Sequence, residues 1–251
     1  MDKALYVAMT GARASLQAQT TVSHNLANVE TAGFKAQLAN TEAFRIQGNG
    51  YPSRIDALHI DQGFDRDVGA QQVTGNPLDV SLSANNWLAV QASDGKEAYT
   101  RGGELALTAN GQLVTSSGRA VLDTEGNPMS IPPHQSLEIG NDGTVSIVPL
   151  GEGPQAMSAI GTLKVVNAPA DQLTRRLDGL MRNVSEDPTK AFPLATGIAL
   201  HTGALEGSNV DAAGALVQMI QLQRQFEMQV KVIKNGDENA QSANTLLRMS
   251  G

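Results

Sequence analysis

The chain has 251 residues, enough for one large domain or two small ones, and its net charge is −7 at neutral pH. An acidic chain lacks the basic face needed to bind nucleic acid or an anionic membrane, and no apolar run is long enough to span a bilayer. The absence of cysteine excludes disulfides, thiol catalysis and cysteine-based zinc sites.

Residues 2–29 are predicted to form a helix, because alanine and leucine are abundant and proline is absent. Gly11 weakens this helix by about 1 kcal/mol relative to alanine. The helix is expected to end near Asn28–Gly33, where asparagine and glycine tolerate a left-handed backbone. Steps of four and three residues define its predicted apolar stripe, which consists of Leu5, Met9, Ala12, Leu16, Gln19, Ser23 and Leu26.

Residues 36–74 alternate only weakly in polarity and contain several chain breakers, among them Gly48, Asn49, Gly50 and Pro52. Such a segment packs poorly on its own. We expect an extended linker arm with room for one or two strands.

The segment 75–205 is predicted to be a β-rich domain. Leu78–Leu82 alternates with a period of two, Trp87–Val90 follows an Asn-Asn turn, and Asp94-Gly95 predicts a hairpin turn. Turn signals recur roughly every 8 to 16 residues, which favours antiparallel strands over βαβ units. Late strands are expected at 163–166 and 198–200.

A second long helix is predicted from about Val210, with Ser208 or Asn209 as its cap and Asp211 in its first turn. Asn235-Gly236 is expected to kink or fray it. Its predicted stripe is mostly apolar and lasts about five heptads, longer than an ordinary globular helix needs. The stripe consists of Ala212, Leu216, Met219, Gln223, Phe226, Val230, Ile233, Asp237, Ala240, Asn244 and Leu247.

No catalytic or metal-binding constellation stands out in the sequence. The four histidines lie in four separate segments, and none has a second histidine three or four residues away. Asp61, Asp65 and Asp67 lack the glycine and the closing glutamate of a calcium loop. No nucleophile elbow or phosphate-binding loop is present. We therefore expect a protein that is not an enzyme and that has no cofactor and no metal.

Two readings of the helical stripes remain open: core-facing helices of a compact domain, or surfaces that pack between subunits. We favour the second reading. The helices lie at opposite chain ends, the β region is large enough to fold alone, and glutamine is abundant on the polar faces. Uncharged amides face other proteins at a lower desolvation cost than charges do.

The segment Asn25–Lys35 matches every fixed position of the pattern N-x-A-N-x-x-T-x-G-[FY]-[KR], and on it the chain resembles the flagellar rod and hook protein family. Further blocks follow in the family's order at Gly75–Val80, Tyr99–Gly103, Ala109–Val114 and Leu205–Val210. The length and the opening residues Met1–Tyr6 are most similar to proximal-rod members, with distal-rod or hook subunits as the alternative. Ala84–Leu88 departs from the family because it lacks the usual glycine-rich turn.

The resemblance implies an α+β fold, with a discontinuous helical coiled-coil domain from residues 1–35 and 206–251 and a central antiparallel β domain. It implies export by the flagellar type III path without a cleaved signal peptide, and assembly into a torque-transmitting rod in the periplasm. The implied partners are copies of the chain, neighbouring proximal-rod subunits, the distal rod and the export apparatus, with no nucleic acid and no small-molecule substrate. The residues implied in assembly are Asn25, Leu26, Ala27, Asn28, Thr31, Gly33, Phe34, Lys35, Leu205, Glu206, Ser208, Asn209, Val210, Leu216, Met219, Ile220, Arg224, Phe226, Glu227 and Val230.

The resemblance also implies individual roles. Asn25 and Asn28 are expected to bond the backbone at the end of the first helix, Gly33 to supply an unrestricted φ, and Phe34 to anchor the chain as it leaves. Glu206 and Asn209 are expected to fix the start of the second helix, and Arg224 with Glu227 to make polar contacts.

A competing reading is a secreted module that binds or hydrolyses cell-wall glycan. A glycosidase needs two carboxylates in a cleft with aromatic platforms for the sugar. Aromatic residues make up only 4% of the chain, with a single tryptophan. We therefore disfavour this reading.

Overall fold

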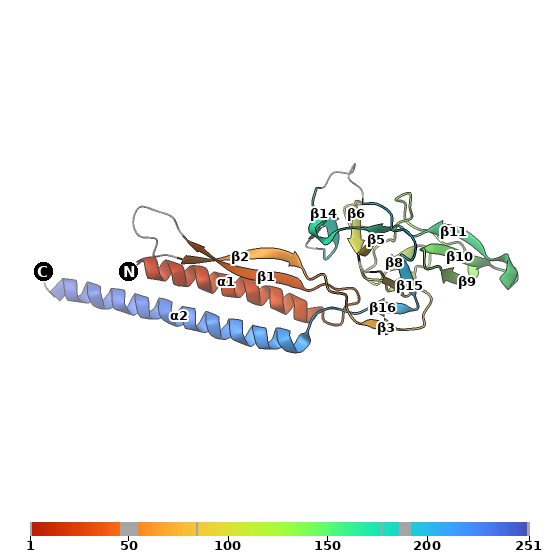
Figure 1. The fold of residues 1–251 in the computed structure, drawn as a ribbon. Coiled ribbons are helices and arrows are strands. Elements are labelled where there is room, and N and C mark those ends of the chain that lie inside the picture. The colour runs from red at the N-terminus through yellow and green to blue at the C-terminus, as the bar shows by residue number, and fades with distance from the viewer. Residues whose placement is uncertain (1, 46–54, 84, 177, 186–191, 250–251) are drawn as a thin grey trace. The chain divides into compact units, whose positions relative to one another are not determined.

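The computed structural model describes residues 2–45, 55–83, 85–176, 178–185 and 192–249. The described chain is α+β, with one long helix near each terminus and antiparallel strands between them (Figure 1). It divides into a helical unit, residues 1–29, 36–65 and 210–251, and a β-rich unit, residues 30–35 and 66–209. None of the described helices has the length and apolarity needed to cross a membrane.

The helical unit contains α1 (Asp2–Ala27), α2 (Ala212–Met249), β1 (Gln37–Arg45) and β2 (Ile55–Phe64). α1 and α2 pack side by side in opposite directions, and α2 continues beyond the first residue of α1 (Figure 1). β1 and β2 form an antiparallel ribbon, and both strands contact α1. α1 is therefore covered both by α2 and by a ribbon formed from the predicted linker arm.

The buried face of α1 consists of small residues. Its buried positions are Ala8, Gly11, Ala12, Ala14, Ser15, Ala18, Val22 and Asn25. The predicted stripe was correct at Ala12 but wrong at Met9 and Leu16, which are 59% and 45% exposed. Small side chains let α2 and the ribbon approach closely, whereas the prediction gave more weight to large apolar residues.

The shielded face of α2, called here its inward stripe, repeats at steps of three and four residues. It consists of Ala212, Ala215, Met219, Leu222, Phe226, Gln229, Ile233, Gly236 and Ala240. The predicted stripe shares five of these positions but is wrong at Leu216, Gln223, Val230 and Asp237, which are exposed. The side chains of Asn244 and Leu247 lie outside the described residues. The helix continues through Asn235 and Gly236, so its secondary structure is not interrupted there. The kink, bend or local fraying expected at this point stays a prediction.

The start of α2 is capped by Asp211. Its carboxylate accepts a hydrogen bond from the Ala213 amide at 3.1 Å. The predicted caps Ser208 and Asn209 do not fill this position, and Asn209 instead donates its side-chain amide to the Asp67 carbonyl at 3.0 Å. Asp211 satisfies an amide that the first helical turn leaves without a partner.

Every pair of described strands in the β-rich unit is antiparallel. A five-stranded sheet has the order β12-β5-β6-β14-β13, a three-stranded sheet has the order β11-β10-β9, and three two-stranded pairs are β15-β4, β16-β3 and β7-β8. Short 3-10 helices, Pro154–Ala156 and Ala170–Gln172, precede β11 and β13. The strands are β3 Gln71–Val73, β4 Val80–Leu82, β5 Asn86–Gln91, β6 Glu97–Thr100, β7 Leu105–Leu107, β8 Leu113–Thr115, β9 His134–Ile139, β10 Thr144–Pro149, β11 Ser158–Thr162, β12 Val165–Asn167, β13 Leu173–Arg175, β14 Met181–Asn183, β15 Leu200–Thr202 and β16 Ala204–Glu206.

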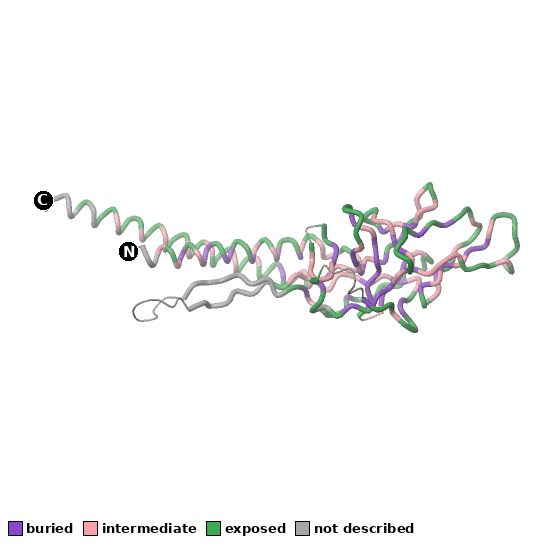
Figure 2. The backbone as a smooth tube through the Cα atoms, turned by 90° about the horizontal axis from the view of Figure 1, so that it is seen from above, coloured by how far each residue is buried: buried purple, intermediate pink, exposed green. Residues whose placement is uncertain are grey.

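Most of the deeply buried side chains belong to this unit (Figure 2). Leu88, Val90 and Val121 are fully buried. The predicted hairpin turn is present between β5 and β6, where Gly95 has a φ of 76°. The two late strands were predicted about two residues early.

Candidate functional site

Three charged side chains from distant parts of the chain meet in the β-rich unit, and we call them the charge cluster: Lys35, Arg101 and Glu206. Lys35 Nζ lies 2.7 Å from Glu206 Oε1. Arg101 Nε lies 2.7 Å from Glu206 Oε2, and Arg101 Nη2 donates to the same oxygen. The three side chains are at most 3% exposed. One carboxylate thus receives two cations away from water.

Gly33 allows this close meeting. Its φ is 69°, and its amide donates to the Glu206 carbonyl at 2.7 Å. A Cβ at this position would lie 2.2 Å from the Arg101 carbonyl oxygen. Only glycine combines the left-handed conformation with this approach. Gly33 therefore fixes the backbone two residues before Lys35.

Main-chain groups complete the charge cluster. Lys35 Nζ also donates to the Asp67 carbonyl, and Glu206 Oε1 accepts the Gly69 amide at 3.1 Å. The Arg101 guanidinium donates to the carbonyls of Leu82 and Asn86, each at 2.9 Å, and lies 5.6 Å from the centre of the Trp87 ring. All three charges have polar partners, so the arrangement suits a structural lock.

Two effects oppose each other at the Glu206 carboxyl. Burial raises its pKa, whereas the charges and hydrogen bonds of Arg101 and Lys35 lower it. The second effect is larger, so the pKa of Glu206 lies below its ordinary value. Glu206 is therefore ionised at neutral pH.

The charge cluster lies next to the points where the chain passes between the two units. In the β-rich unit these points are flanked by Glu30, Lys35, Arg66 and Asn209. The Asn209 amide donates to the Phe34 carbonyl at 3.3 Å. Together with the Asp67 carbonyl, these groups tie three separate chain segments to one another within the β-rich unit.

Two signature residues of the helical unit have different partners. Asn28 Nδ2 donates to the His24 carbonyl at 2.8 Å, so the predicted bond to the helix end is present. Asn25 instead exchanges two hydrogen bonds of 2.9 Å with the backbone of Gln37, at the start of β1. The predicted role of Asn25 was wrong, because its side chain holds the ribbon and not the helix end.

Phe34 also has a clear partner. The Arg175 guanidinium lies over its ring, 4.5 Å from the centroid. Arg175 Nη2 also donates to the Lys35 carbonyl at 3.0 Å. Phe34 is thus anchored, as predicted, by an arginine that the sequence analysis did not identify.

The predicted assembly residues of α2 fall into two groups. Met219 and Phe226 belong to the inward stripe, whereas Leu216, Ile220, Arg224, Glu227 and Val230 are exposed. Glu227 accepts a hydrogen bond from Gln223 at 3.4 Å, and the described residues show no ion pair between Glu227 and Arg224. The remaining predicted motif residues are exposed or partly shielded: Leu26, Ala27, Thr31, Leu205, Ser208 and Val210.

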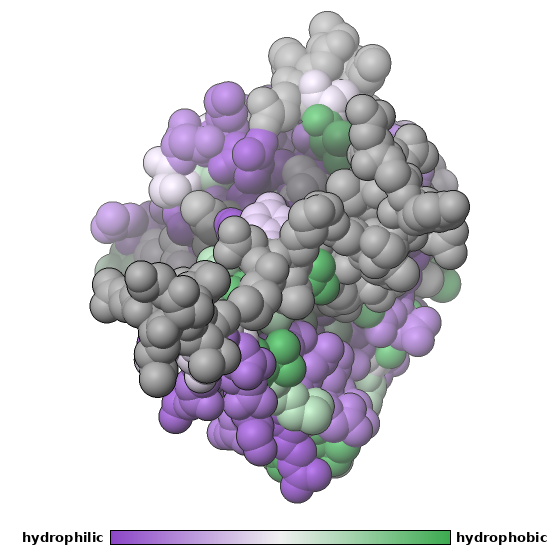
Figure 3. All heavy atoms as spheres, turned by 90° about the vertical axis from the view of Figure 1, so that its left-hand side faces the viewer, coloured by the Kyte–Doolittle hydropathy of each residue, from purple (hydrophilic) through white to green (hydrophobic). Residues whose placement is uncertain are grey.

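Both long helices leave large apolar side chains exposed. On α1, Tyr6, Met9 and Leu16 are 45–60% exposed. Figure 3, which views the end where both chain termini lie, shows hydrophobic residues interspersed with hydrophilic ones. Large apolar side chains are exposed on α2 as well. On α2 they are Leu216, Val217, Ile220, Met228, Val230 and Val232, at 43–62% exposure.

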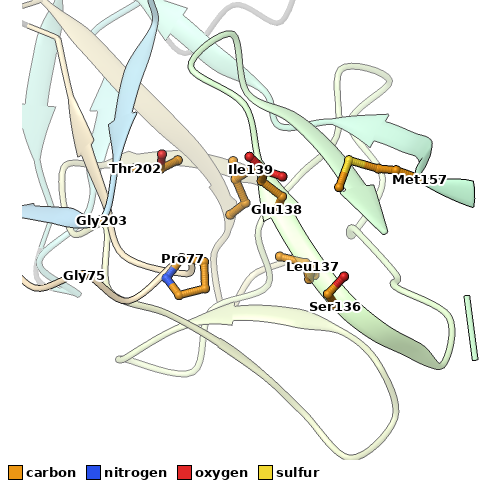
Figure 4. A pocket seen from close by; sticks show the side chains of 9 residues that line it. All are labelled: Gly75, Pro77, Ser136, Leu137, Glu138, Ile139, Met157, Thr202 and Gly203. Carbon is orange, nitrogen blue, oxygen red and sulfur yellow. The ribbon is translucent and has the colours of Figure 1, made fainter. Parts of the chain in front are cut away.

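A groove of about 380 Å³ lies in the β-rich unit, between β9 and the turns at Gly75–Pro77 and Thr202–Gly203 (Figure 4). Leu137, Ile139 and Met157 give it an apolar side, and Glu138 is the only charged residue among the described ones that line it. No histidine or lysine is among the described residues that line it. Within the described chain, no three acidic or histidine side chains are placed to hold a metal ion.

Arg101, Asp67 and Arg175 were missed as site residues. Arg101 lies in one of the sequence blocks that carried the resemblance, which was the available signal. Its partner Glu206 is 105 residues away, so the pairing could not be read from a local pattern. Asp67 takes part through its backbone, which leaves no side-chain signature.

Three family models match the chain: "Flagella basal body rod protein" at residues 5–35, "Flagellar hook protein FlgE/F/G D1 domain" at 82–147, and "Flagellar basal body rod FlgEFG protein C-terminal" at 201–246. The charge cluster takes Lys35, Arg101 and Glu206 from these three segments in turn.

Whole-chain relatives extend this similarity. The chain is 39% identical over its full length to the full-length flagellar basal-body rod protein FlgF of Escherichia coli K12. It is 31% identical to FlgF of Caulobacter vibrioides, over 97% of both chains. It is 30% identical to the flagellar basal-body rod protein FlgG of Bacillus subtilis, over 99% of this chain and all of the relative.

Proposed function

The chain belongs to the family of flagellar basal-body rod proteins and is a structural subunit of the bacterial flagellar rod, and we propose that its two long helices are the surfaces by which it joins that rod. The role proposed is mechanical and not catalytic: the subunit passes torque to its neighbours through packed helices. Proximal-rod position is favoured over distal-rod or hook position because FlgF of Escherichia coli is 39% identical to the chain, whereas FlgG of Bacillus subtilis is 30% identical.

One observation carries the proposal: the exposed apolar residues of α2 lie outside the inward stripe. α1 covers the inward stripe, while Leu216, Ile220 and Val230 remain 43–52% exposed. Burying such side chains releases about 25 cal/mol for each Å² of apolar surface removed from water. Neighbouring helices in a rod supply the cover that the single chain lacks.

The steps of three and four residues in the inward stripe fit a coiled coil formed by α1 and α2. This pair would belong to the terminal assembly domain of residues 1–35 and 206–251, and residues 75–205 would form a separate β-rich domain. Head-to-tail contacts between copies of the chain, and with adjacent proximal-rod and distal-rod subunits, would extend an open helical assembly.

Export by the flagellar type III apparatus, without a cleaved signal peptide, and a final position in the periplasm complete the proposal. A chain without cysteine suits passage between compartments, because no disulfide has to be reduced or formed. A coiled coil completed by neighbours couples folding of the ends to assembly.

Assembly is tested by placing a charge on the exposed face. Ile220→Glu and Leu216→Glu should abolish swimming when they replace the wild-type chain in cells, because each buries an unpaired carboxylate at the subunit contact. Both positions are exposed in the single chain, so circular dichroism of the purified variants should be unchanged.

Gln225→Glu is the matched control, since it adds the same charge at an exposed polar position of the same helix. It should leave swimming intact. Normal rods in cells that carry both Ile220→Glu and Leu216→Glu would refute the assigned surface. Loss of peptidoglycan-degrading activity after mutation of an acidic residue would instead revive the reading as a glycan-degrading module.

A further inference from the structure

Two glycines in the long helices each face a side chain of the opposite helix. A Cβ built on Gly11 of α1 would lie 2.8 Å from Gln229 Nε2, and one built on Gly236 of α2 would lie 2.8 Å from Leu5 Cδ2. Neither glycine has a positive φ. The backbone therefore gives no reason for glycine, although each costs about 1 kcal/mol of helix stability relative to alanine.

Both contacts belong to one antiparallel register. Six residues separate Leu5 from Gly11 along α1, and seven separate Gln229 from Gly236 along α2. Each interval is about two helical turns. The helices thus exchange a side chain in each direction: α2 fills the space at Gly11, and α1 fills the space at Gly236.

Much of the buried face of α1 offers little shape by which a register could be selected. Ala8, Ala12, Ser15 and Ala18 on the buried face of α1 are similar in size, so sliding by a heptad exchanges one small residue for another. Gly11 and Gly236 make the alternative registers differ in how well the helices pack. A slide of seven residues in one direction sets Gly11 against Gly236 and leaves a void, and a slide in the other direction sets the Gln229 amide against Leu5.

Gln229 adds a polar element to the same contact. Its Oε1 is buried and has no hydrogen-bond partner among the described residues. A polar side chain in a helical contact lowers stability but selects one register over others. Stability alone would favour an apolar residue here, which supports a role in register.

We propose that Gly11 and Gly236 are paired sockets, filled by Gln229 and Leu5, that set the register of α1 against α2. The register decides which part of α2 has no α1 beside it, from about Asn239 onward, and a slide of one heptad changes that part by seven residues. The consequence for subunit packing rests on the proposed function, whereas the register itself does not.

The test uses disulfide trapping, because the chain contains no cysteine of its own. Ala8 lies midway between the two α1 contact residues, and Ile233 of the inward stripe lies midway between those of α2. The pair Ala8→Cys with Ile233→Cys reports the native register. Ala8→Cys combined with Phe226→Cys reports a slide of one heptad in one direction. Ala8→Cys combined with Ala240→Cys reports a slide of one heptad in the other direction.

In the purified chain, the native pair should oxidise at least about tenfold faster than either slid pair, as expected for a register preference of about 1.4 kcal/mol. Equal rates for the three pairs would overturn the proposal. Gly11→Leu should slow the native pair about tenfold by overpacking the socket. Ser23→Leu, on the exposed face of α1, should leave it unchanged.

Moving the large side chain from α2 to α1 distinguishes a loss of the native register from general damage to the helix pair. Gly11→Leu combined with Gln229→Ala should restore the native cross-link to within about threefold of the wild-type rate, because Gln229→Ala removes as many non-hydrogen atoms as Gly11→Leu adds. Failure of this rescue, or an unchanged rate in Gly11→Leu alone, contradicts the assigned sockets. If cross-linking behaves as expected while Ile220→Glu still forms rods, the register stands and the proposed assembly surface falls.

Discussion

Glu206 shows, at the scale of one residue, why a position in the family motif tolerates few substitutions. Its carboxylate is buried, so it needs cations, and Lys35 and Arg101 reach it only because the backbones at Gly33 and Gly69 come close. Removing one member of a buried ion pair leaves the other charges without compensation. The charge cluster is therefore more sensitive to substitution than a surface ion pair.

Glu206→Gln should lower the free energy of unfolding of the β-rich unit by about 3 kcal/mol or more, because two buried cations lose their counterion. Trp87, the single tryptophan of the chain, lies beside Arg101 and is buried, so its fluorescence follows urea unfolding of this unit. Glu152→Gln, at an exposed carboxylate, is the control and should change the value by less than about 0.5 kcal/mol. Equal stability of both variants would show that the charge cluster does not act as a lock.

Lowering the pH should reduce the stability that the charge cluster gives to the β-rich unit. The pKa of Glu206 is lowered in the folded chain, so the unfolded chain binds its proton first as the pH falls. The stabilisation is fully present above the ordinary glutamate value of 4.5 and is lost as the pH falls through the lower folded pKa. Urea titrations at pH 7 and at lower pH should show a steeper loss in the wild type than in Glu206→Gln. Parallel curves would remove Glu206 from the acid response.

At the scale of elements, the start of α2 depends on Asp211. Asp211→Ala should cost about 1 kcal/mol of helix stability, because the Ala213 amide loses its acceptor. Asp211→Asn keeps a cap and should remain near wild type. Thermal melting followed by circular dichroism at 222 nm compares the two. If Asn209→Ala lowered the melting temperature more than Asp211→Ala, the cap would be misassigned.

The elements were more predictable than the faces they bury. Abundant alanine and leucine predicted the first helix, a long apolar stripe predicted the second, and alternation with turn signals predicted the antiparallel strands. The buried face of α2 was only half predicted. Gln229 and Gly236 belong to it although no apolar pattern selects them, and the apolar Ala215 and Leu222 were missed as well. The prediction chose Leu216 and Val230 instead, because the exposed side of α2 also carries large apolar residues. Hydrophobicity alone does not distinguish an inner contact from an outer one.

At the scale of the whole molecule, burial is distributed unequally between the two units. The β-rich unit has its own core, with Leu88 and Val90 fully buried, whereas α2 has only Ala215 below a tenth exposed among its described side chains. Local stability follows such burial. The β-rich unit should therefore be stable in the free chain, and the helical unit should gain most of its stability from neighbours.

Hydrogen exchange measures this difference directly. In the free chain, amides of β5 and β6 should exchange slowest, and those of α2 beyond about Asn239 fastest, because no α1 residue covers that end. In isolated rods the α2 amides should slow by at least about tenfold, since burying its exposed apolar residues adds more than about 1.4 kcal/mol to the cost of local opening. Amides of β5, already closed in the free chain, serve as the internal control and should change little. If α2 in the free chain were as protected as β5, its folding would not depend on assembly, and the exposed residues of α2 would need another explanation.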